Sequence, residues 1–381
     1  MSLPGRRRAK TALRGEILAV ALALALIGVL GTAGCARVLS AAMPSGVIQP
    51  RIVPPSTEQG SLGVTREFAF ENRTIRLSVP VDRAVYAGAT SAQKSAIFFG
   101  DSKPGDWVPD YYRAFVNEEH QDAFYAAMLK TLREVRQRDG LDASRYAELI
   151  TSMVQSLEYR TDPGSLAPKF PVETFADGYG DCDDKTLLAA GLLSRDGYDV
   201  AILLFRPEKH VALGIRAPGV DYKNTGYAYV ELTEPSLIGV PAEKLAGGIA
   251  LTSQPTVIKI GEGTGAFLAG DQIDYIQRRL REVDSAAKRL QNEIASKTTQ
   301  HTSRRASLDQ ARQALSTTSD PNALAVAVPR YNEQVQAYNA LTTELNGLIS
   351  RYNALVDVQR YVADHQTARP QVYEQLRSAR F

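Results

Sequence analysis

The feature that most constrains the fold is a heptad pattern near the C-terminal end of the chain. From Asp271 onward, apolar residues recur at alternating spacings of three and four. This spacing predicts a long α-helix with one apolar seam. An interruption at 316–322 separates it from a second helix, so the sequence predicts an antiparallel helical hairpin, or coiled coil, over residues 271–366. The seam consists of Ile273, Ile276, Leu280, Val283, Ala287, Leu290 and Ile294, followed by Tyr331, Tyr338, Leu345 and Tyr352.

The hairpin has two interpretations. It is either a brace folded against a globular domain, or a coiled coil through which the protein self-associates or binds a partner. Because the interruption is short, the two seams can bury each other without a partner. This favours the brace.

The first 37 residues predict the compartment. Basic residues between Arg6 and Arg14 precede Ile17 to Ala36, a segment of twenty residues without a charge. Such a pattern is typical of a chain that meets the membrane. Three fates are open: a retained transmembrane anchor, a lipoprotein attached through Cys35 in a Thr-Ala-Gly-Cys box, or a cleaved signal. All three predict that the rest of the chain lies on the extracytoplasmic face of the membrane.

The segments that follow predict the remaining organisation. Four prolines within 38–62 indicate a flexible tether. The folded domain is expected over 63–260, where a strand hairpin and helices precede several antiparallel strands, and this order favours an α+β fold over a parallel sheet. A Gly-rich linker at 261–270 then leads to the hairpin, and 367–381 is expected to be a tail.

Composition excludes several functional classes. Hydrophobic residues make up 44% of the 381 residues and charged residues 23%, which excludes wholesale disorder and a polytopic membrane protein. The net charge of +2 lacks the basic footprint that nucleic-acid binding needs. Two cysteines, Cys35 and Cys182, cannot form the disulfide framework of a small secreted scaffold.

Cys182 is the first candidate for chemistry. Gly178-Tyr179-Gly180-Asp181 predicts a tight turn, after which Asp181 caps a helix that begins at Cys182. At this position the amide dipoles favour the thiolate form. Asp183 and Asp184 oppose this effect by their like charge, so a cationic partner is needed.

His210 and Glu231 complete a candidate site. Among the four histidines, His210 begins a strand close after the cysteine helix, and Glu231 lies on the following strand. Cysteine, histidine and carboxylate on these elements form a nucleophile, base and orienting acid, although Glu234 is a rival for the acid. The aspartates around Cys182 are better used as helix caps than as metal ligands. Since 261–270 also lacks a phosphate-loop lysine, no metal and no cofactor are predicted.

The local motifs resemble those of a known family. Asp177-Gly-Tyr-Gly-Asp-Cys-Asp-Asp-Lys-Thr186, Gly197-Tyr-Asp-Val200, His210 and Tyr229-Val-Glu-Leu-Thr233 are similar to the transglutaminase-like superfamily over roughly residues 63–249. The resemblance implies a papain-like fold in which Cys182 is the nucleophile, His210 the base and Glu231 the acid. Glu231-Leu-Thr233 stands where the superfamily often has Asp-Pro-Thr.

Two functional hypotheses follow. The first is an exported, membrane-tethered enzyme of thiol acyl transfer that hydrolyses, deamidates or cross-links a protein or cell-envelope substrate. The second is a non-catalytic envelope scaffold that binds through the same fold and the helical hairpin.

Tyr159 could border the cleft of the candidate site, but core packing is the expected role of its side chain.

Overall fold

The computed structural model describes residues 46–99, 107–161, 167–242, 244–245 and 248–379. The apolar segment 17–36 and Cys35, on which the anchor, lipoprotein and signal predictions depend, lie outside these ranges. Within them, no helix is both long enough and apolar enough to cross a bilayer. This finding goes against the prediction of a transmembrane protein.

The folded domain opens with a strand hairpin. Strands β2 (Ser61–Phe70) and β3 (Arg73–Asp82) pair antiparallel along their full length. Glu71 and Asn72 form the turn with positive φ angles of 46° and 62°, which a two-residue hairpin turn requires. The side chains of β3 alternate between exposed and buried, as the period-two pattern predicts. The buried face contacts the helices that follow.

Helices dominate the next part of the chain, as predicted. Two of them, α4 and α6, lie inside the core, because their residues are buried almost throughout. A short 3-10 turn, η1 (Glu119–Gln121), precedes α3. The α-helices are α1 (Arg83–Ser91), α2 (Val108–Val116), α3 (Asp122–Asp139), α4 (Ala143–Gln155), α5 (Pro171–Asp177) and α6 (Cys182–Arg195).

A four-stranded antiparallel sheet completes the domain. Its strand order is β10-β7-β8-β9, formed by β7 (Val200–Phe205), β8 (His210–Ile215), β9 (Ala228–Val230) and β10 (Thr256–Ile260). Alternate residues of β8 face opposite ways: Val211 joins the main core beside α6, whereas Ala212 joins a second cluster with Phe205 and Tyr229. The mixed helical and antiparallel architecture confirms the α+β prediction at this coarse level.

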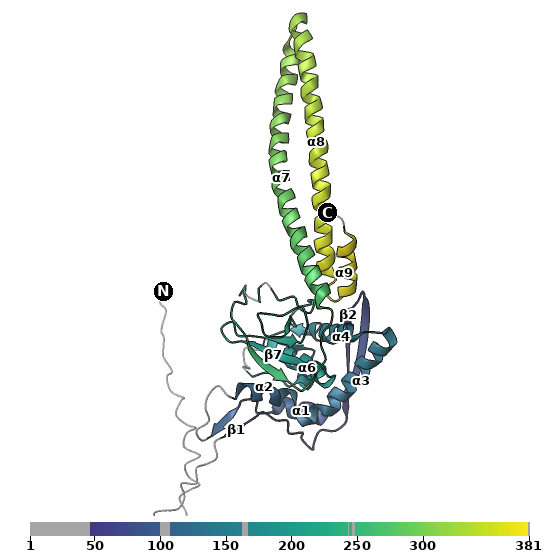
Figure 1. Ribbon diagram of the computed structural model, residues 1–381, viewed down its shortest axis with the longest axis vertical. Helices are drawn as coiled ribbons and strands as arrows, with labels where there is room; N and C mark the ends of the chain where they lie inside the picture. Colours follow the sequence, from purple (N-terminus) through teal and green to yellow (C-terminus); the bar gives the residue numbers. More distant parts are fainter. Residues whose placement is uncertain (1–45, 100–106, 162–166, 243, 246–247, 380–381) are drawn as a thin grey trace, which may run out of the picture.

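The predicted hairpin is present as two long helices. Helix α7 (Gly270–Thr317) and helix α8 (Pro321–Asp364) run antiparallel and project from the domain (Figure 1). Near the domain the seam is fully buried at Ile276 and Leu355, which belong to the same core as the domain. The segment expected to be a tail contains a further helix, α9 (Arg369–Ser378), which packs against α7 and α8.

The two segments expected to be flexible connections are packed in the described part. Ile52, within the predicted tether, is fully buried and its N–H donates to Glu118 over 3.2 Å. In the predicted Gly-rich linker, a Cβ added to Gly263 would lie 2.1 Å from the carbonyl oxygen of Tyr198. Glycine is therefore needed there for close backbone packing. Two small sheets remain, formed by β1 (Gly46–Ile48) with β4 (Ile97–Phe99), and by β5 (Glu158–Tyr159) with β6 (Tyr179–Gly180).

Candidate active site

Helix α6 begins at Cys182, where the sequence predicts it. The carboxylate of Asp181 accepts hydrogen bonds from the N–H groups of Asp183 and Asp184, and Asp184 accepts one from the N–H of Asp181. This reciprocal capping box stabilises the first turn and fixes its orientation. The predicted capping role of these aspartates is thereby confirmed.

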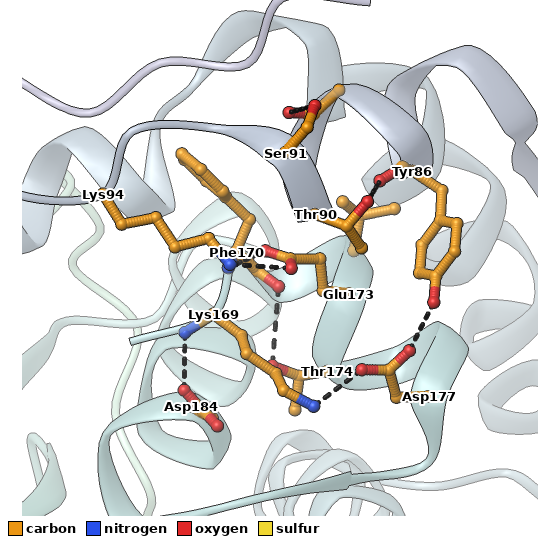
Figure 2. A network of polar contacts seen from close by, with 12 residues as sticks. Tyr86, Thr90, Ser91, Lys94, Lys169, Phe170, Glu173, Thr174, Asp177 and Asp184 are labelled. Atoms are coloured by element: carbon orange, nitrogen blue, oxygen red, sulfur yellow. Dashed lines mark hydrogen bonds and ion pairs between the residues drawn. The ribbon is translucent and has the colours of Figure 1, made fainter. Parts of the chain in front are cut away.

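A polar network anchors this turn to its surroundings (Figure 2). Asp184 also accepts a bond from the backbone N–H of Lys169 over 2.6 Å. The ammonium group of Lys169 contacts Asp177 over 2.6 Å, and the hydroxyl of Tyr86 donates to the other oxygen of that carboxylate. Helix α1, the C-terminal end of α5 and the start of α6 are therefore held together.

Lys185 is a buried charge one turn beyond Cys182. Its side chain is fully buried, and its Nζ donates to the carbonyl oxygens of Gln155 and Leu157 over 3.1 and 2.8 Å. Burial lowers its pKa to about 8, while the charge of Glu231 opposes that shift. This cation satisfies carbonyls at the end of α4 and attaches the cysteine helix to it.

The sulfur of Cys182 meets the open edge of the sheet. Strand β9 pairs only with residues 213–215 of β8, so it leaves the first half of that edge uncovered. Side chains of α6 approach this edge at Val211: the Val211 backbone partly offsets the rise in the pKa of Cys182, and Thr186, one turn further, donates to the Val211 carbonyl over 3.5 Å. The thiol therefore contacts the residue next to His210.

The surroundings of the thiol favour its neutral form. Burial, together with the carboxylates of Asp183 and Asp181, raises the pKa of Cys182 far above its ordinary value. The thiol donates to Asp183 over 3.4 Å. The like charge that the sequence places against the helix terminus, together with lost hydration, therefore outweighs the amide dipoles in this arrangement.

Asp183 is itself held in an unusual environment. Its second oxygen accepts a hydrogen bond from Tyr112 over 3.0 Å. Burial, followed by the charge of Asp181, raises the pKa of Asp183 to about 6. Tyr112 was not singled out by sequence reasoning, since it lies on α2 and only the tertiary fold brings it here.

The imidazole of His210 reaches Glu231 through an intermediate residue. Nε2 of His210 lies 3.1 Å from the hydroxyl of Tyr229, and that hydroxyl donates to Glu231 over 2.7 Å. In the described part of the chain Glu231 makes no direct hydrogen bond to His210. The predicted pair is therefore linked by a residue that sequence reasoning left without a role. The signal was available, because residues two apart on a strand share a face.

Glu231 is fixed from several sides. Its Oε1 accepts from the N–H of Leu232, the N–H of Thr233 and the hydroxyl of Thr233 at 3.0, 2.8 and 2.6 Å. Its backbone carbonyl accepts from the side chain of Gln155 over 2.8 Å. The rival acid Glu234 is exposed. Of the two candidate acids, Glu231 is the one linked to His210 through Tyr229.

His210 is buried, and its surroundings favour the neutral imidazole. Burial lowers its pKa below the ordinary value, against the raising effects of Glu231 and Glu208. Within the described residues, Nδ1 has no hydrogen-bond partner, and no hydrogen bond joins the imidazole to the sulfur of Cys182. The predicted close approach of sulfur and imidazole stays a prediction.

Two other sequence interpretations concern this region. Tyr159 was expected to pack in the core, yet 38% of it is exposed. The ligand atoms of Asp181, Cys182 and Asp183 lie within 4.8 Å of one another, which is close enough to hold a metal ion. These oxygens already cap α6 and accept from Tyr112, and both uses compete with metal coordination.

Comparison of the chain with models of known protein families, with curated proteins and with solved structures finds no match. The candidate site therefore stands on its own geometry.

Proposed function

We propose that the chain is an exported cysteine-dependent acyl-transfer enzyme with a transglutaminase-like domain, acting on a protein or cell-envelope peptide. The observation that carries this proposal is the hydrogen-bonded chain from His210 through Tyr229 to Glu231. It begins at His210, next to Val211, whose backbone the sulfur of Cys182 approaches. A buried imidazole oriented by a carboxylate, within reach of a thiol, is the arrangement that we propose for nucleophilic catalysis.

The proposed reaction has two halves. In the first, the thiol gives its proton to His210 while Sγ attacks a carboxamide or peptide carbonyl carbon. The tetrahedral intermediate then collapses, its C–N bond breaks, and the departing nitrogen takes the proton from His210. A thioester on Cys182 remains. In the second half, water or a primary amine attacks the thioester carbonyl and restores the thiol.

The start of α6 offers one donor for the developing oxyanion. The N–H groups of Asp183 and Asp184 are occupied by Asp181, and the N–H of Lys185 is bonded to the Asp181 carbonyl. Among the described residues, the N–H of Cys182 has no hydrogen-bond partner. A helix N-terminal N–H beside the nucleophile suits an oxyanion.

One observation favours the second candidate function, a non-catalytic scaffold. The thiol of Cys182 is stabilised in its neutral form by burial and by Asp183. A thiol in that state is a poor nucleophile. In the enzyme proposal, substrate binding must therefore displace or neutralise Asp183, whereas in the scaffold proposal the contact is simply structural.

Acylation by an activated ester separates the two candidates. The full-length chain is mixed with para-nitrophenyl acetate, and release of nitrophenolate is followed together with the mass of the peptide that contains Cys182. We expect a stoichiometric burst and an acetyl group on Cys182. The Cys182→Ser variant should give neither, and His210→Gln should slow the burst at least about tenfold.

His301→Gln is the matched control, because His301 lies on the hairpin and bonds to Thr342. It should acylate at the wild-type rate. Acetylation confined to other residues, or a burst that survives Cys182→Ser, would replace the enzyme proposal by the scaffold.

A further inference from the structure

The hydroxyl of Tyr229 decides which nitrogen of His210 carries the hydrogen. This hydroxyl donates to Oε2 of Glu231, and Nε2 of His210 lies 3.1 Å from the same oxygen. A hydroxyl has a single proton, and here that proton points at the carboxylate. The oxygen of Tyr229 can therefore only accept from the imidazole. It follows that Nε2 carries the hydrogen and that Nδ1 of the neutral ring is the basic nitrogen.

The orientation of the Glu231 carboxylate is fixed by its other hydrogen bonds. Three donors already converge on Oε1 of Glu231, from the backbone of Leu232 and from the backbone and hydroxyl of Thr233. Glu231 is only 2% exposed, so water does not compete for the remaining oxygen. Oε2 is thus directed at Tyr229.

The ring of Tyr229 is equally constrained. It is fully buried, and it packs against Tyr222 and Phe205 with ring centroids 5.2 and 6.3 Å apart. Across the sheet it is paired with Gly214, and Ala212 lies on the same face. These contacts hold the ring in one place, with its hydroxyl between His210 and Glu231.

We infer that Tyr229 is a positioning residue that holds His210 in the Nε2–H tautomer, so that Nδ1 accepts the proton of Cys182. Only the second part, in which Nδ1 accepts the proton of Cys182, rests on the proposed function. When the proton passes from Sγ to Nδ1, the imidazolium keeps its Nε2–H bond to Tyr229. The positive charge then faces Glu231 through one hydroxyl, instead of by direct contact.

Nitrogen NMR of the full-length chain labelled with ¹⁵N-histidine tests the tautomer directly. The chain has four histidines, so the His210 signals can be assigned by their loss in His210→Gln. Near neutral pH we expect a protonated Nε2 and a bare Nδ1. Tyr229→Phe, which removes one oxygen, should give a mixture of both tautomers. Tyr222→Phe is the matched control, since it changes a neighbouring ring whose hydroxyl does not contact His210, and it should leave the signals unchanged.

The pH profile of Cys182 alkylation by iodoacetamide supplies the second readout. Loss of the oriented base should lower the rate about tenfold in Tyr229→Phe and leave it unchanged in Tyr222→Phe. A wild-type His210 with its hydrogen on Nδ1 would overturn the inference even if Cys182 is acylated. This measurement uses the wild-type chain, so it does not depend on the folding of a variant. An unchanged tautomer in folded Tyr229→Phe would overturn it as well. The expected tautomers together with a Cys182 that never acylates would keep the role of Tyr229 and remove the proposed function.

Discussion

The two sides of the candidate site are prepared to different degrees. On the imidazole side, His210, Tyr229 and Glu231 form a continuous chain of hydrogen bonds that is buried and fully oriented. On the thiol side, Cys182 donates to Asp183, and negative charge keeps its proton in place. If the site works as proposed, its base is already oriented and its nucleophile is held in a neutral resting form, so activation has to act on the thiol side.

Lys185 joins the two sides, and its removal should have the largest effect. Its ammonium group binds the carbonyl of Gln155, whose side chain binds the backbone of Glu231. Lys185→Ala leaves two buried carbonyls without their donor and opens a cavity in the core. We expect the free energy of unfolding to fall by about 3 kcal/mol in urea denaturation.

Two variants show whether this loss is specific to the buried ammonium group. Lys185→Met refills most of the volume but restores no donor, so it should recover only part of the stability. Lys130→Ala, an exposed lysine of α3, should change the stability by less than about 0.5 kcal/mol. If Lys185→Ala were no worse than Lys130→Ala, the two sides would not depend on Lys185.

The sequence predicts the elements of the site better than their connections. Helix α6 begins at Cys182 because Asp181 and Asp184 form a local capping box, and local signals of this kind can be read from sequence. The link through Tyr229 and the thiol environment set by Tyr112 depend on contacts between distant segments. Periodicity places a residue on a face, but it does not say which side chain across the fold reaches it.

The hairpin and the missed strand illustrate the same limit. A seam that repeats every seven residues along α7 and α8 is long enough to be unambiguous. Strand β10 has only five residues and follows a long irregular segment, so only its pairing with β7 identifies it. The close approach of Gly263 to the backbone of Tyr198 could not be predicted either, since a Gly-rich segment suits a flexible linker and a close backbone approach equally well.

The thiol side should also make stability depend on pH. The folded pKa of Asp183, raised to about 6 by burial and by Asp181, lies above the ordinary value of 3.8. The folded state therefore binds this proton more tightly than the unfolded state. The stabilisation that comes from this bound proton is complete below about pH 4 and is lost as the pH rises to about 6.

Asp183→Asn lacks this titration. Relative to wild type, its free energy of unfolding should improve by on the order of 2 kcal/mol between about pH 4 and pH 7, measured by urea denaturation across that range. Asp309→Asn, which changes an exposed carboxylate on α7, should run parallel to wild type. If the profile of Asp183→Asn ran parallel to that of wild type, burial of the Asp183 carboxylate would not lower the stability of the folded state.

Asp183→Asn should also make the thiol of Cys182 more reactive. Removing the charge of Asp183 lowers the pKa of Cys182, because that carboxylate is the largest cause of the raised value after burial. At about pH 8 a larger fraction of the sulfur is then thiolate, and iodoacetamide should alkylate Cys182 about tenfold faster. The rate is followed by mass spectrometry of the peptide that contains Cys182. A slower reaction in Asp183→Asn would show that Asp183 assists the nucleophile and does not restrain it.

Tyr112→Phe should have the smallest effect, with the opposite sign. The hydroxyl of Tyr112 donates to Asp183 over 3.0 Å and so draws off part of the negative charge that faces the sulfur. Without this donor the carboxylate accepts more strongly from the thiol, and alkylation of Cys182 at about pH 8 should slow about threefold. Tyr111→Phe is the matched control, because its hydroxyl donates to the carbonyl of Lys94 instead, and the rate should not change. Opposite responses to Asp183→Asn and Tyr112→Phe, measured in the same assay, are expected only if the charge of Asp183 sets the state of the thiol. A faster reaction in Tyr112→Phe would instead mean that the tyrosine shields Cys182 from the reagent.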